Sequence, residues 1–195
     1  FSFSRREKDF RLTPNTEELK AYKRYRLTDS GVSSMALPGM EGGEHAATGL
    51  EHREDGSPSY EPENHRAMTE KRWKKLELAK LDSVMPVRFG AADAEIGIIG
   101  WGSTEGAVRE AISMANEAGM KVAALYPKLL NPLHIDVIEE FVTPLKKVIV
   151  VENNYAGQFA AILESNGISC EPFTLCEGRP FKVVEILNRI EESTY

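Results

Sequence analysis

The chain has 195 residues, which is enough for one or two domains and for a sizeable hydrophobic core. Hydrophobic residues make up 42% and charged residues 28%, values typical of globular proteins, and the formal net charge is -6. The negative balance argues against nucleic acid or an anionic membrane as a main partner. No apolar run approaches the length of a membrane span, so no membrane insertion is expected.

The chain carries two cysteines, Cys170 and Cys176. Two thiols cannot build a disulfide framework, and an iron–sulfur cluster usually takes four. We therefore expect a reducing, cytoplasmic location. The chain opens at Phe1 rather than at a methionine, which predicts a fragment, a processed chain or a trimmed chain.

Residues 1–93 are expected to be irregular, apart from one helix. Glycines and prolines punctuate residues 38–62, and a loop this long is usually functional or ordered by packing on a partner. A charged helix is predicted over residues 64–81, with Met68 among the apolar residues of one side, and Trp73 in the middle of its basic cluster suggests one buried edge. Its basic cluster is predicted to be a solvated or subunit-facing surface: Lys71, Arg72, Lys74 and Lys75. Residues 84–93 are expected to be a short connector.

Residues 94–195 alternate between apolar runs and helical stripes. Strands are predicted at residues 96–100, 122–125, 148–151 and 168–175. Helices are predicted at residues 104–118, 131–142, 156–165 and 181–190. This alternation indicates βαβ units, and continuous apolar strands indicate burial on both faces. The fold class that follows is a three-layer α/β/α domain with a mainly parallel sheet.

Several local signals set the expected boundaries of these helices. Gly119 follows the first helix at a place where a left-handed residue is wanted. Asn131 precedes Pro132 and is predicted to cap the second helix. In the third helix Ile162 is expected to point inward with its apolar neighbours, and Gly167 closes that helix.

A glycine-rich turn at residues 100–106 follows a predicted strand and opens a helix. Such turns can bind an anion, and Gly102, Ser103 and Thr104 are the candidates for a phosphate or coenzyme A site. The spacing departs from the dinucleotide-binding fingerprint, and Glu105 in the first turn repels phosphate. The alternative is a tight strand-to-helix turn that Ser103 or Thr104 caps.

A polar tract follows the strongest strand: Glu152, Asn153 and Asn154. Ligands of open α/β sheets gather at carboxyl ends of strands, so Glu152 could act in acid/base chemistry. The favoured alternative is that these side chains cap the next helix and satisfy the backbone of the turn. They can also contact a neighbouring domain or subunit.

A second polar cluster lies in the glycine-rich loop, around Glu51 and His52, with Glu44, His45, Glu54 and Asp55 nearby. Metal binding or proton transfer is conceivable for these residue types. The spacing lacks a helical ligand pair, so no metal site is predicted. We expect an ordered loop at a domain or subunit boundary, with its histidines bonded to the backbone.

Four stretches together are similar to one protein family. They are residues 25–39, residues 42–56, residues 68–76, and the pair 100–106 with 151–158. In this order and spacing the chain resembles the alpha subunits of 2-oxoacid:ferredoxin oxidoreductases, especially the 2-oxoglutarate type. The resemblance implies a transketolase C-terminal-like domain over residues 94–195, with a five-stranded sheet that has one antiparallel strand. It makes residues 1–93 the end of a preceding domain plus a linking helix.

The resemblance also implies a reaction. Such enzymes decarboxylate a 2-oxoacid oxidatively with coenzyme A, giving an acyl-CoA, carbon dioxide and reduced ferredoxin. The whole enzyme uses thiamine diphosphate, magnesium and iron–sulfur clusters, and its partners are a beta subunit and ferredoxin in a dimer or higher oligomer.

For the chain itself the resemblance implies a supporting role. No catalytic residue, cofactor or metal is assigned to it, because the activating glutamate and the diphosphate-binding tract of the family lie elsewhere. The chain is expected to be structural and assembly-forming, and inactive alone. The alternative is a nucleotide- or coenzyme A-binding module that uses the turn at residues 100–106.

Overall fold

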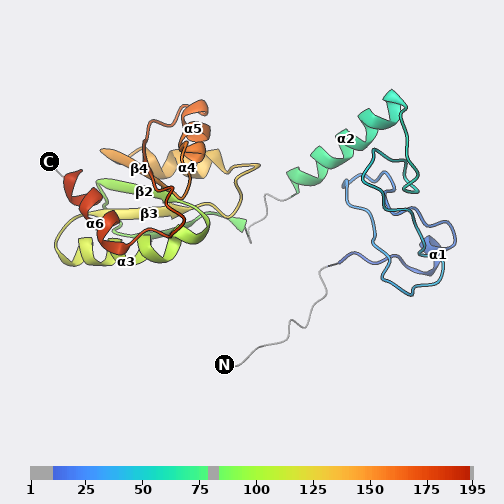
Figure 1. Ribbon diagram of the computed structural model, residues 1–195, viewed down its shortest axis with the longest axis horizontal. Coiled ribbons are helices and arrows are strands. Elements are labelled where there is room, and N and C mark those ends of the chain that lie inside the picture. The colour runs from blue at the N-terminus through green and yellow to red at the C-terminus, as the bar shows by residue number, and fades with distance from the viewer. Residues whose placement is uncertain (1–10, 79–83, 194–195) are drawn as a thin grey trace. The chain divides into compact units, whose positions relative to one another are not determined.

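The structure, a computed structural model, describes residues 11–78 and 84–193 (Figure 1). The chain forms two compact units, one up to Ala79 and the other from Lys80 onward. This division lies earlier than the expected boundary between residues 93 and 94. We call them the first unit and the second unit, and describe each by itself.

The first unit is mostly irregular, as expected, with two helices in its described part. The short helix α1 (Thr16–Leu19) begins at Asn15, whose side chain accepts hydrogen bonds from the backbone of Glu17 and Glu18. Helix α2 (Pro62–Glu77) corresponds to the predicted charged helix, and Met68 is its buried residue. Its predicted continuation to residue 81 lies outside the described residues.

The second unit contains a five-stranded sheet in the order β1-β3-β2-β4-β5. The strands are β1 (Val87–Gly90), β2 (Ile96–Gly100), β3 (Val122–Tyr126), β4 (Lys147–Glu152) and β5 (Glu171–Thr174). Strands β2, β3, β4 and β5 pair in parallel, whereas β1 pairs antiparallel with β3. One antiparallel strand in five confirms the expected sheet.

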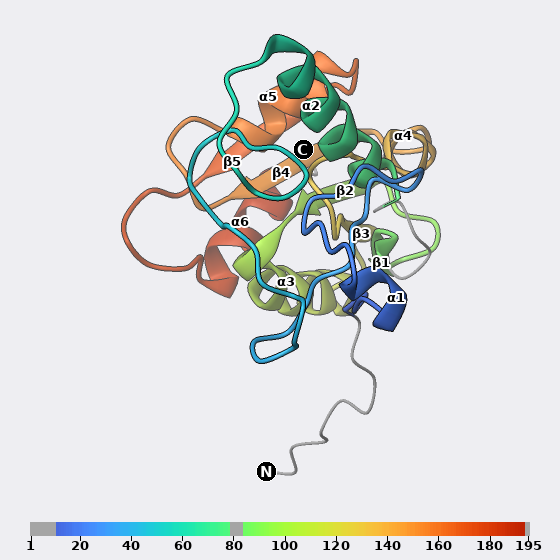
Figure 2. The same cartoon turned by 90° about the vertical axis from the view of Figure 1, so that its right-hand side faces the viewer.

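Helices cover both faces of this sheet (Figure 1). Helices α3 (Glu105–Glu117) and α6 (Val183–Glu192) pack on one face, and α4 (Ile135–Val142) and α5 (Gln158–Ser165) on the other. Figure 2 shows the same unit from the side, with the strands following one another across the sheet from β5 to β1. The two resulting cores contain Ile98, Ile112 and Ile186 on one face and Ile99, Ile138 and Phe159 on the other. Strands β2 and β3 are buried throughout because both faces are covered.

The strand and helix predictions of the second unit are confirmed in type and order. Residues Val148 to Val151 lie in the buried strand β4, and Gly119 has the left-handed φ of 87° expected after α3. The last strand is shorter than predicted, because only Glu171–Thr174 pairs with β4. None of the described helices combines the length and the apolar character that a membrane span requires.

Four local predictions are wrong. Asn131 does not cap a helix, because α4 starts only at Ile135, where the apolar periodicity begins, and His134 occupies the capping position. Ile162 is 41% exposed, because Ala160 takes the inward position beside Phe159. Trp73 is 62% exposed, since α2 packs its Met68 side inward instead.

The fourth correction concerns the predicted connector at residues 84–93. It contains β1, which extends the sheet by pairing with β3. Its burial alternates along the strand, as in an edge strand, and Gly90 has φ 96° with Val122 O only 2.5 Å from where a Cβ would lie. A four-residue strand with a glycine at its end carries a weak sequence signal.

Candidate functional site

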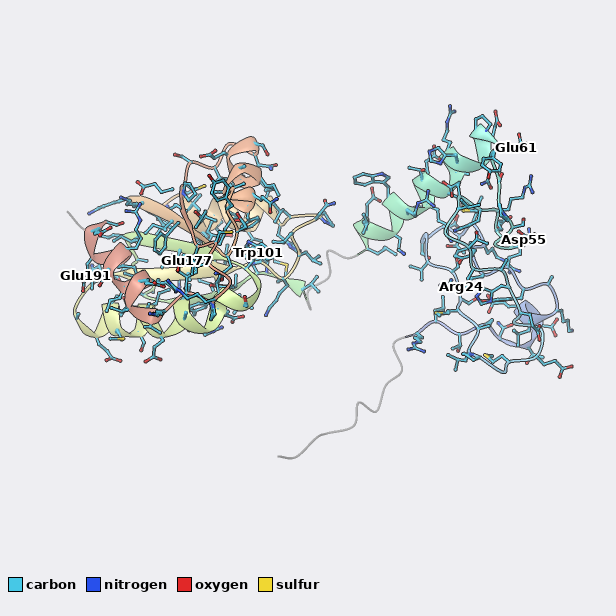
Figure 3. All side chains as sticks on the ribbon, viewed as in Figure 1. Arg24, Asp55, Glu61, Trp101, Glu177 and Glu191 are labelled. Carbon is cyan, nitrogen blue, oxygen red and sulfur yellow. The ribbon has the colours of Figure 1, made fainter. Side chains whose placement is uncertain are left out.

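The carboxyl ends of β2 and β4 bring two predicted site segments together. The strands are parallel neighbours, with Gly100 opposite Val151. The next residues, Trp101 and Glu152, therefore lie side by side, and the Trp101 indole Nε1 is 3.5 Å from Glu152 Oε2. Figure 3 shows Trp101 on the loop that follows β2. The sheet thus places the turn at residues 100–106 beside the polar tract after β4.

Glu152 is fully buried, and its carboxylate faces hydrogen-bond donors. Its Oε2 accepts from the backbone N–H of Phe159 at 2.8 Å and its Oε1 from that of Ala160 at 2.9 Å. Asn154 Nδ2 donates to the same carboxylate at 2.7 Å. A carboxylate at the N-terminus of α5 satisfies free N–H groups there and interacts favourably with the helix dipole. These hydrogen bonds match the favoured alternative, in which Glu152 caps the helix that follows the strand.

The two asparagines do different work. Asn154 Oδ1 accepts from the backbone N–H of Gly157 at 2.7 Å, so the side chain links Glu152 to the start of α5. Gly157 there has φ 61°, and a Cβ would lie 3.2 Å from Pro172 Cβ. Asn153 instead donates to the Arg179 carbonyl oxygen at 3.3 Å and contacts the tail before α6. The structure therefore joins Glu152 to Asn154 but directs Asn153 elsewhere.

The predicted anion-binding turn forms a 3-10 turn, η2 (Gly102–Thr104), that leads into α3. Gly102 and Ser103 are exposed, whereas Thr104 is buried. The Thr104 hydroxyl donates to the Trp101 carbonyl oxygen at 3.0 Å and lies 2.9 Å from the Tyr126 hydroxyl. The side chain of Thr104, one of the three candidate residues, is thus engaged in internal contacts. Anion binding by this turn stays a prediction.

Tyr126 belongs to this site and was missed from the sequence. Burial raises its pKa above the ordinary value, so the hydroxyl is protonated at neutral pH. A Cβ at Gly100 would lie 2.3 Å from the Tyr126 hydroxyl, which explains the glycine at the end of β2. That glycine was the available signal, although nothing in the sequence identified the side chain that fills its space.

A separate polar cluster in the first unit is centred on Glu51. Its carboxylate accepts from both Arg72 terminal nitrogens, at 3.2 and 2.9 Å, and lies 2.6 Å from His65 Nδ1. The Arg72 hydrogen bonds, with that of His65, lower the pKa of Glu51 to about 2. Glu51 was predicted as a loop residue, whereas its partners were missed because they lie far along the chain. It joins the glycine-rich loop to α2.

The histidines of this loop bond to the backbone, as expected. His45 Nδ1 is 2.9 Å from the Gly43 carbonyl oxygen, and His52 Nδ1 is 3.1 Å from that of Arg53. The His52 ring also stacks on Tyr25 with 3.8 Å between centroids. Within residues 11–78 and 84–193, no three His, Cys, Asp or Glu side chains are placed to hold a metal ion.

The described side chains around Glu152 and around Glu51 therefore hold the backbone and the loops in place. Two thiols, Cys170 and Cys176, lie in the second unit, and burial raises the pKa of Cys170 to about 11. They do not fit an iron–sulfur cluster, because four thiolates are the usual ligand set.

Comparison with known proteins places this architecture in a family. Residues 94–189 match the model of the pyruvate:ferredoxin oxidoreductase core domain II. A structure titled 2-oxoglutarate:ferredoxin oxidoreductase from Magnetococcus marinus is 41% identical with a TM-score of 0.77, over 95% of this chain. This chain belongs to the alpha subunits of the 2-oxoacid:ferredoxin oxidoreductases.

Curated relatives agree with this family. The alpha subunit of a 2-oxoacid:ferredoxin oxidoreductase from Aeropyrum pernix is 30% identical to the present chain. The match covers 88% of the present chain and 28% of the Aeropyrum subunit. The 2-oxoglutarate oxidoreductase subunit KorA from Mycobacterium tuberculosis is 34% identical over 87% of the chain and 26% of its own length. The Magnetococcus protein is covered over 32% of its length. The chain thus spans about a quarter to a third of the length of these proteins.

Proposed function

We propose that this chain is the C-terminal part of an alpha subunit in an enzyme that decarboxylates a 2-oxoacid oxidatively with coenzyme A. The products are an acyl-CoA, carbon dioxide and reduced ferredoxin. The observation that carries the proposal is the 41% identity, over 95% of the chain, to a protein whose structure holds 2-oxoglutarate, coenzyme A and succinyl-CoA. The proposed substrate is 2-oxoglutarate on the same ground.

Within that enzyme we propose a structural and assembly-forming role for the chain. The support is what its two polar clusters contact: Glu152 and Asn154 bind the backbone at the start of α5, and Glu51 links the glycine-rich loop to α2. Exposed aromatic residues remain on both units, including Tyr60 at 88% and Tyr155 at 87%. Such side chains are enriched where a surface meets another protein.

The proposed enzyme includes a beta subunit, works with ferredoxin, forms a dimer or higher oligomer and is cytoplasmic. Thiamine diphosphate supplies the carbanion chemistry, with magnesium holding its diphosphate and iron–sulfur clusters taking the electrons. The chain has two cysteines, fewer than the four thiolates that an iron–sulfur cluster usually takes. We therefore propose that the clusters, with the other cofactors, are held by other parts of the enzyme.

Turnover assays test this proposal. The complete alpha subunit is assembled with its beta subunit, and dye reduction is measured with coenzyme A and either 2-oxoglutarate or pyruvate. We expect turnover with 2-oxoglutarate in preference to pyruvate, and none from the 195-residue chain alone. Turnover by the isolated chain, or failure of the assembled enzyme with every 2-oxoacid tried, contradicts the proposal.

A further inference from the structure

The first unit contains a pocket of about 370 Å³ between α2 and the loop before it. The loop is held against the helix by the Lys71 ammonium, which donates to the Tyr25 carbonyl oxygen at 3.0 Å. The backbone of Gly31 lies close against α2, because a Cβ at this position would lie 2.6 Å from the Lys71 carbonyl oxygen. The pocket is therefore a product of close loop–helix packing.

Basic side chains dominate the polar lining of this pocket. Among them Arg24, Lys71 and Lys75 have no ion pair with a described carboxylate, whereas Arg72 is engaged by Glu51. Arg24 and Lys71 lie near the Tyr25 ring, at 5.2 and 6.0 Å from its centroid. Figure 3 labels Arg24 in this irregular part of the unit. Among the described residues that line the pocket, none is acidic.

The carboxylate that acts on Lys71 is already engaged by other groups. Glu54 acts on Lys71 from a distance, but its carboxylate accepts from Lys23 Nζ at 3.0 Å and from the backbone N–H of Leu27 at 2.9 Å. Burial, with the charges of Arg24 and Lys75, lowers the pKa of Lys71 to about 8. Crowding of like charges around a partly desolvated space is unfavourable unless an anion neutralises them.

We propose that this pocket binds a phosphate group of a small molecule. Three cations match a phosphate better than a carboxylate, because a phosphate monoester carries a charge near -2 at neutral pH. Arg24 offers a fork of N–H donors, and the lysines add compact positive charges. The apolar part of the lining, which includes Val32, Met35 and Met68, suits an organic group attached to the phosphate.

The test is calorimetric titration of the 195-residue chain at pH 7 and low salt with pyrophosphate, adenosine 3′,5′-bisphosphate or 2-oxoglutarate. We expect saturable binding of both phosphate compounds, and their order of affinity tells whether the organic group contributes. Loss of one charged hydrogen bond weakens binding by about tenfold or more. Lys75→Gln and Arg24→Gln should show this effect.

The matched control is Lys74→Gln, an exposed lysine on the same helix that does not line the pocket. It should leave the affinity unchanged within about twofold, because an exposed lysine outside the pocket acts on the bound phosphate only weakly, through water of high dielectric constant. Circular dichroism of each variant verifies that α2 is intact. Absence of saturable heat in the parent chain overturns the proposal. So does tighter binding of 2-oxoglutarate than of pyrophosphate, or an equal loss in Lys74→Gln and Lys75→Gln.

Discussion

At the scale of single residues, the Glu51–Arg72 pair makes a pH-dependent contribution to the first unit. The folded-state pKa of Glu51 is about 2, below the ordinary 4.5. A carboxylate with a depressed pKa stabilises the fold above its unfolded pKa, and the contribution is lost as pH falls toward 2. Because both side chains are partly exposed, we expect an effect of roughly 1 kcal/mol.

Arg72→Gln tests this pair. It removes the largest cause of the shift, so the pKa of Glu51 should rise toward 4.5 while the His65 contact retains part of the depression. The measurement is a carboxyl-carbon NMR titration of the chain. Lys74→Gln on the same helix is the control and should leave the pKa of Glu51 unchanged. An unchanged Glu51 titration in Arg72→Gln would show that the pair does not form in solution.

At the scale of elements, two glycines at the starts of helices should respond oppositely to alanine. Gly157 precedes α5 with φ 61° and lies close to Pro172, so Gly157→Ala should lower the free energy of unfolding by about 1–2 kcal/mol. Gly106 lies in α3 with open space around it, so Gly106→Ala should raise it by about 0.5 kcal/mol. Urea unfolding of both variants measures the difference, and equal effects would refute this assignment of their roles.

The same scale shows what could be predicted from the sequence. Helix α3 was predictable because Val108, Ala111, Ile112 and Ala115 repeat at helical spacing, and all four are buried. Strand β1 was missed because its stability comes from pairing with β3, a contact that its own four residues do not encode. The predicted cap at Asn131 failed for a related reason, since local preference yields to the packing of α4.

The candidate site divides in the same way. Glu152 and Asn154 were predictable as caps, because polar residues after a buried strand commonly serve the next turn. The partners that complete the clusters, Tyr126 and Arg72, come from distant segments and became visible only in the fold. Sequence spacing carries no record of such contacts.

At the scale of the whole molecule, the proposed role of the chain is to support chemistry performed by other parts of the enzyme. Its family membership rests on both units, since the relatives cover most of the chain, whereas the core domain model matches only residues 94–189. The buried carboxylate of Glu152 offers the strictest test of this supporting role. It lies at a strand end where ligands of α/β proteins gather, yet it is engaged by α5.

Glu152→Gln in the assembled enzyme is therefore the most direct test. Loss of an acceptor facing the N–H groups of α5 should lower the free energy of unfolding by about 2–3 kcal/mol. The rate of 2-oxoacid oxidation per intact complex should stay within about twofold of the parent rate, because a supporting group leaves the barrier unchanged. Glu164→Gln, exposed on the same helix, is the control and should alter neither quantity. A rate loss of about a hundredfold or more with assembly intact, the scale of a missing acid or base, would contradict the supporting role.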